Sequence, residues 1–123
     1  MTTQTFELTV PTSALINANH RTHWRVKANK VSAIRGGFDL AARLNGFLPM
    51  SRAHAVCHLS FGDDRRRDPN NWSDTAKAAI DGCVDAGVLE DDDHKHLVGP
   101  DMRIGPVGKR GEVTISLTFK EIA

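Results

Sequence analysis

The chain has 123 residues, of which 40% are hydrophobic and 25% charged, and its net charge is +1. This length corresponds to a single domain over residues 1–123, and the composition is that of a soluble globular protein. No apolar run is long enough to cross a bilayer, and MTTQTFELTV does not resemble a signal peptide, so we expect a cytoplasmic protein with no membrane partner. Cys57 and Cys83 lie in apolar patterns and are expected to be buried thiols.

The charges are segregated along the chain. No acid lies between Glu7 and Asp39, whereas ten of the fifteen acids lie between Asp63 and Asp93. A solvated basic face is the ordinary explanation of the first segment. A basic segment combined with clustered carboxylates is nevertheless what a metal-dependent enzyme acting on a polyanion requires. The basic residues of the first segment are Arg21, Arg25, Lys27, Lys30 and Arg35.

The first half of the sequence predicts a strand followed by a helix. Residues 6–10, FELTV, form a strand candidate that Pro11 should end, because proline lacks the backbone donor. From Trp24 to Leu44 apolar residues recur every three or four positions, which is helical spacing. Gly36 and Gly37 lie inside this segment, and each costs about 1 kcal/mol relative to alanine, so we expect a bend or break there.

The second half predicts three more strands or strand-like segments around another helix. Residues 53–61 alternate as a half-buried strand does, and a helix fits from about Asn71 to Ala86 with Gly87 as its stop. Residues 96–111 contain two Gly-Pro dipeptides and indicate a short strand plus a loop or hairpin, and residues 112–119 form the clearest strand. The order β, α, β, α, β, β predicts an α+β fold, with two main helices packed on a mixed β-sheet.

One face of the second predicted helix is polar. Asn70, Asp74, Lys77 and Asp81 fall within an arc of roughly 60° at 100° per residue. The ordinary explanation is an amphipathic helix with Asn71 as its N-cap, Asp74 favoured by the helix dipole, and Lys77 paired with Asp74 or Asp81. We favour this structural explanation for Asp74 over a role in a functional site.

Acidic residues also flank this helix. Asp68 precedes a proline, which favours an extended backbone at Asp68. We therefore expect the Asp68 side chain to lie beside the start of the helix. The run Glu90–Asp93 follows the helix, and a solvated turn is its ordinary explanation. If the fold brings this run near Asp68, Mg²⁺ would offset the repulsion, because it binds one or two carboxylates together with waters and phosphate oxygens. His94 and His96 are a weaker candidate for a transition-metal site, and ordinary surface histidines are favoured.

The string RRRDPNN, followed by TAKAAIDGCVDAGVLEDDDHKH, resembles the RusA family of Holliday junction resolvases. The resemblance covers residues 61–98, about half the chain, and rests on an arginine-flanked aspartate and asparagine, a helical lysine and aspartate, and a downstream acidic pair. The matching positions are Asp68, Asn71, Lys77, Asp81, Asp91 and Asp92.

The resemblance implies a homodimeric endonuclease that cuts opposing strands of a four-way DNA junction and depends on Mg²⁺, with Mn²⁺ as a possible substitute. Members of the family commonly come from phages and prophages. In this picture Lys77 and Asp68 are catalytic, and the metal ligands are Asp68, Asn70, Asp91 and Asp92. The residues expected to grip the DNA backbone are Arg65, Arg66, Arg67, Arg21, Arg25, Lys27 and Lys30.

Two departures from the family pattern leave alternatives open. Asn70 stands where the family usually has a second aspartate, and three extra residues separate Asn71 from Lys77. The lost charge predicts weaker metal binding, with Asp74 or Asp93 as a candidate replacement. One alternative is therefore a branched-DNA-binding module with weakened or absent catalysis. Another is a structural dimer whose acidic turn binds Ca²⁺ or a basic partner.

Overall fold

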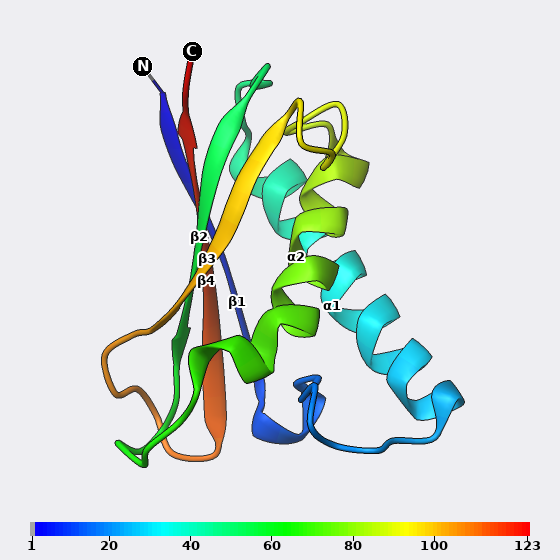
Figure 1. Cartoon of the computed structure of the whole chain (residues 1–123), viewed down its shortest axis with the longest axis vertical. Coiled ribbons are helices and arrows are strands. Elements are labelled where there is room, and N and C mark those ends of the chain that lie inside the picture. The colour runs from blue at the N-terminus through cyan, green and yellow to red at the C-terminus, as the bar shows by residue number, and fades with distance from the viewer. Residues whose placement is uncertain (1) are drawn as a thin grey trace.

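The computed structural model of the protein describes residues 2–123. Four strands form one mixed sheet in the order β1-β4-β2-β3, and α1 and α2 lie side by side against one of its faces (Figure 1). This arrangement confirms the predicted α+β fold with a mixed sheet and two main helices. The elements are β1 (Thr3–Pro11), η1 (Thr12–Ala14), α1 (Trp24–Asn45), β2 (Ala53–Ser60), η2 (Pro69–Trp72), α2 (Ser73–Ala86), β3 (Leu97–Ile104) and β4 (Glu112–Glu121), where η1 and η2 are short 3-10 helices.

The sheet is built around β4, which pairs antiparallel with both β1 and β2, while β3 adds to β2 in parallel. Alternate side chains of β4 and β2 are fully buried beneath the helices, as their period-two patterns predict. The uncovered face is polar, and its threonine hydroxyls pair across β1 and β4 at 2.9 Å. The buried side chains of β4 are Val113, Ile115, Leu117 and Phe119.

The two helices pack closely at Gly82 of α2. A Cβ atom at this position would overlap the backbone carbonyl oxygen of Arg35 and crowd the Cβ of Phe38. Phe38 is fully buried and Ile34 is 1% exposed, so the inner face of α1 is part of the core. Burial of side chains of this size stabilises the fold by about 1.5–3 kcal/mol each. No helix within residues 2–123 has both the length and the apolar character needed to span a membrane.

Two details of the first half differ from the sequence prediction. Pro11 is the last residue of β1 rather than a residue beyond it, which an edge strand tolerates because one side of its backbone has no partner strand. The expected break at Gly36 and Gly37 is wrong, because α1 runs uninterrupted from Trp24 to Asn45. A Cβ at Gly37 would lie 2.6 Å from the side chain of Leu8, so this glycine makes room for β1.

The start of α2 also differs from the prediction. The helix begins at Ser73 after the 3-10 turn of η2, and Trp72 occupies its N-cap position without a side-chain hydrogen bond. The N-cap role predicted for Asn71 is therefore wrong. Gly87 ends α2 in the left-handed conformation, as predicted. Both cysteines are free and buried, and burial raises the pKa of each thiol to about 12.

Candidate functional site

Lys77 brings together two carboxylates that lie eleven positions apart in the sequence. Its Nζ donates to Asp81 Oδ1 at 2.7 Å, one turn further along α2, and also to Asp92 Oδ2 in the acidic segment that follows the helix. The Lys77 side chain is 60% exposed, whereas those of Asp81 and Asp92 are 23% and 25% exposed. We call Lys77, Asp81 and Asp92 the lysine–carboxylate cluster. It unites three of the motif positions on one solvent-accessible surface.

The cluster fixes the charge of its members. Desolvation lowers the pKa of Lys77, but the hydrogen bonds that its ammonium donates to Asp81 and Asp92 outweigh this effect and raise the pKa above the usual value. The hydrogen bond from Lys77 holds the pKa of Asp92 below its usual range. Lys77 is therefore a cation at neutral pH, and it can stabilise negative charge but cannot act as a general base.

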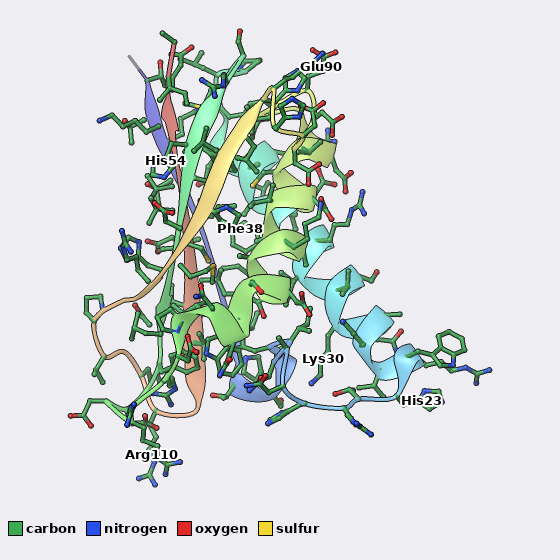
Figure 2. The ribbon with its side chains drawn as sticks, viewed as in Figure 1. His23, Lys30, Phe38, His54, Glu90 and Arg110 are labelled. Carbon is green, nitrogen blue, oxygen red and sulfur yellow. The ribbon has the colours of Figure 1, made fainter. Side chains whose placement is uncertain are left out.

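Asp68 and Asn70 lie at the opposite end of α2 from the acidic segment. Asp68 has the extended backbone that Pro69 favours, and its carboxylate accepts a hydrogen bond from the backbone N–H of Asn70 at 3.1 Å. Helix α2 has 14 residues, and about 1.5 Å of rise per residue separates its ends by about 21 Å. Glu90 lies beyond the far end of this helix (Figure 2).

The predicted metal ligands are accordingly divided: Asp92 meets Lys77 and Asp81 along the middle of α2, whereas Asp68 and Asn70 lie before Ser73, the first residue of this helix. Within residues 2–123, no group of three or more His, Cys, Asp or Glu side chains could hold a metal ion. Two carboxylates do meet, those of Asp81 and Asp92, and one or two carboxylates are what Mg²⁺ usually takes from a protein. Asp91 adjoins them, and its Oδ1 accepts a hydrogen bond from the Asp92 N–H at 2.7 Å. These carboxylates are oxygen ligands of the kind that Mg²⁺ takes, and in this structure Asp81 and Asp92 share the ammonium of Lys77.

Asp81 is the member of this site that the sequence prediction did not name as a ligand. Its position four residues after Lys77, on the polar stripe of the helix, was the available signal. Asn71 has a structural role instead. Its side-chain oxygen accepts a hydrogen bond from Asn19 at 3.0 Å, and its backbone carbonyl accepts one from Ala18 at 2.8 Å.

The three consecutive arginines have different environments. The Arg67 guanidinium lies 3.8 Å from the ring centre of Phe61 and pairs with Asp63 at 2.8 Å, and its side chain is only 16% exposed. Arg65 is 83% exposed, with its nearest carboxylate at 3.8 Å, and Arg66 is exposed. Arg65 and Arg66 are thus accessible to a phosphate, whereas Arg67 anchors the loop.

Of the four basic residues from Arg21 to Lys30 that are predicted to grip DNA, Lys27 is the one shown to pair with α2 in the described part of the chain. Lys27 pairs with Asp74 at 3.3 Å, and the two residues share a groove of about 160 Å³ with Lys77 and Asp81. Lys30 donates to the backbone carbonyl of Leu15 at 3.3 Å. Arg21 and Arg25 are exposed, and Arg25 lies over the ring of Trp24 at 5.1 Å. Lys27 therefore connects the basic segment to the lysine–carboxylate cluster.

The two downstream histidines do not converge. His96 pairs with Asp93 at 2.6 Å and lies 3.7 Å from Glu90, and the hydrogen bond to Asp93 raises its pKa. His94 is exposed. His96 therefore contacts two acids of the segment that follows α2.

No protein-family model matches the chain, and no curated protein is similar to it in sequence.

Proposed function

We propose that the protein is a Mg²⁺-dependent endonuclease of the RusA type, which acts as a homodimer and cuts opposing strands of four-way DNA junctions. The observation that supports this proposal best is the meeting of Lys77, Asp81 and Asp92 on an exposed surface. All three residues also match positions of the family pattern in the sequence. Asp81 and Asp92 would hold the metal ion, with Asp91 beside them.

The reaction would depend on the charges that the protein fixes in advance. Mg²⁺, when bound, would neutralise charge on the phosphodiester oxygens. Lys77 carries a full positive charge at neutral pH and would stabilise the negative charge that develops on the attacked phosphate. Lys27, across the groove, would contact the same strand through a neighbouring phosphate.

Two symmetric incisions require two active sites related by a two-fold axis, which is the reason for proposing a homodimer. Exposed apolar side chains in and after the second half of α1 offer surface for such an association. Leu40, Leu44 and Leu48 are 57%, 76% and 63% exposed. Their burial against a second copy would remove this apolar area from water.

The test is cleavage of a synthetic four-way junction, with a linear duplex of the same sequence as the comparison. We expect paired nicks in the junction with Mg²⁺ or Mn²⁺ and none with EDTA. Lys77→Met should reduce the rate about 10²–10³-fold, the usual effect of removing one group that stabilises transition-state charge. Lys120→Met, an exposed lysine on β4, is the matched control and should cleave normally.

Other outcomes distinguish the alternatives. Specific junction binding without cleavage at any metal concentration would contradict the nuclease and support a DNA-binding module. Absence of DNA affinity would contradict both and favour a structural dimer. Asp68→Asn tests whether the residues before α2 take part in the reaction. Loss of cleavage in this variant would show that Asp68 is needed.

A further inference from the structure

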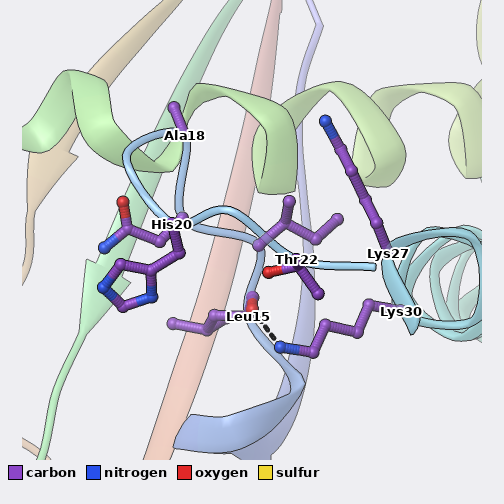
Figure 3. A pocket seen from close by; sticks show the side chains of 8 residues that line it. Leu15, Ala18, His20, Thr22, Lys27 and Lys30 are labelled. Atoms are coloured by element: carbon purple, nitrogen blue, oxygen red, sulfur yellow. Dashed lines mark hydrogen bonds between the residues drawn. The ribbon is translucent and has the colours of Figure 1, made fainter. Parts of the chain in front are cut away.

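A small cavity lies between the segment that follows η1 and the first turns of α1. Its volume is about 50 Å³, and its wall includes Leu15, His20 and Thr22 from the segment and Lys27 and Lys30 from the helix. In Figure 3, Lys30 reaches from α1 to Leu15, while Lys27 extends toward α2. The cavity is therefore polar on the side that the helix supplies.

Lys30 is the unusual member of this cavity because its charge has no counter-charge. The residue is half-buried, and the one hydrogen bond of its ammonium goes to the neutral carbonyl of Leu15 at 3.3 Å. Among residues 2–123 it enters no ion pair, whereas Lys27 and Lys77 each bind a carboxylate. A partly desolvated cation without a carboxylate is unfavourable, and a bound anion would compensate it.

The donors around the cavity suit an anion with several acceptor oxygens. The Lys30 ammonium, Thr22 and His20 line it together with the stem of Lys27, whose ammonium pairs with Asp74, and the wall itself contains no carboxylate. Helix α1 begins at Trp24, inside this stretch, and has no acidic residue in its first turn, so the positive end of its dipole is not offset there. Phosphate presents tetrahedral oxygens to such donors and carries the matching charge.

Lys27 joins this cavity to the groove of the lysine–carboxylate cluster. The same side chain lines the cavity and, together with Asp74, Lys77 and Asp81, the groove between α1 and α2. A DNA strand with one phosphate at Lys77 can therefore continue past Lys27 toward Lys30.

We propose that the cavity formed by Thr22, Lys27, Lys30 and His20 is a phosphate-binding site that holds a backbone phosphate of the DNA strand beside the one at Lys77. This inference rests on the proposed function for the identity of the ligand as DNA. The site itself requires only phosphate chemistry, so it can be tested with inorganic phosphate.

The first test is a titration of the ¹⁵N-labelled protein with inorganic phosphate, followed by amide chemical shifts. We expect saturable shifts in residues 15–22 and at Lys27 and Lys30. Lys30→Met should weaken binding about tenfold, in line with loss of one charge-assisted hydrogen bond, while Lys30→Arg should retain most of it. Lys120→Met should bind as the unaltered protein does.

Asp74→Asn provides an independent test of whether Lys27 contributes to phosphate binding. Removal of the Asp74 charge frees Lys27 from its ion pair, so phosphate should bind several-fold more tightly. Shifts that are absent from residues 15–22, or that are the same in Lys30→Met, would overturn the proposal. The spectra of Lys30→Met and Lys30→Arg also show whether each variant is folded.

The second test uses the four-way junction and separates this inference from the proposed function. Lys30→Met should reduce the slope of log Kd for the junction against log salt concentration by about 1, because one phosphate contact is lost. Junction cleavage with an unchanged slope in Lys30→Met would refute the phosphate site alone. Phosphate binding at residues 15–22 without any junction affinity would refute the proposed function and the DNA ligand but support the site.

Discussion

The substitution Lys77→Met tests the charge balance of the lysine–carboxylate cluster. Methionine keeps most of the aliphatic stem but removes the ammonium, which leaves Asp81 and Asp92 side by side without a counter-charge. Partly exposed ion pairs each contribute about 0.2–1 kcal/mol. Loss of two pairs, together with repulsion between the carboxylates, should lower the free energy of unfolding by about 1–2 kcal/mol at pH 7. For a chain of this size that corresponds to roughly 4–8 °C in Tm.

The pH dependence of this loss follows from the directions of the pKa shifts. The pKa of Asp92 is lowered from 3.8 in the folded protein, so its contribution to stability is present above that value and disappears as the pH falls through the lowered pKa. The pKa of Lys77 is raised from 10.5, so its contribution is present below that value and disappears as the pH rises through the raised pKa. The effect of Lys77→Met should therefore be largest between these limits and smaller at pH 2.5 than at pH 7.

The assay is urea unfolding of the unaltered protein, Lys77→Met and Lys120→Met at pH 7 and pH 2.5, with and without 10 mM Mg²⁺. Mg²⁺ should stabilise Lys77→Met more than the unaltered protein, because the two carboxylates no longer share an ammonium. An equal loss of stability at both pH values would refute the electrostatic explanation and indicate packing of the lysine stem. Equal effects of Mg²⁺ on both proteins would argue against Asp81 and Asp92 as its ligands.

Three further predictions concern other parts of the chain. Gly82→Ala should destabilise the protein by about 2–3 kcal/mol in urea unfolding, because the added Cβ would overlap the backbone of α1. Gly36→Ala is the control, since its Cβ would point into open space, and it should stabilise the protein by about 0.5–1 kcal/mol. Similar effects of the two changes would contradict the close helix contact. The raised pKa of His96 beside Asp93 contributes stability at low pH that is lost as the pH rises through that pKa, so substitution of His96 by Gln should cost more at pH 5.5 than at pH 8.5, and a constant cost would refute the ion pair. Because the proposed Mg²⁺ ligands are Asp81 and Asp92, Asn70→Asp, which lies before α2, should leave the Mg²⁺ requirement of the nuclease unchanged, and a lower requirement in this variant would place position 70 at the metal instead.

The strands and helices could be predicted because their patterns are strong and local. In β4 the alternation of Val113, Ile115, Leu117 and Phe119 is complete, and all four are fully buried. The predictions that failed concern positions whose structure is determined by contacts between segments distant in the sequence. Gly37 was expected to interrupt α1, but the glycine accommodates Leu8 of β1, which lies 29 positions earlier in the chain.

The candidate site was only partly predictable for the same reason. The pair of Lys77 and Asp81 follows from helical spacing, whereas the approach of Asp92 depends on the path of the chain after Gly87. The distance from Asp68 to the acidic segment depends on how that segment folds at the far end of α2. Sequence spacing along the chain contains no information on that path.

The position of β4 at the centre of the sheet has a consequence for how the molecule folds. Thr5 of β1 meets Thr118 of β4 across 113 positions, and β2 meets the other side of the same strand. During synthesis, β1 and β2 therefore have no strand to pair with between them until residues 112–121 have left the ribosome. Pairing between segments so distant in the sequence slows folding. Truncation within β4 would split the sheet into two parts, whereas the loss of an edge strand would only narrow it.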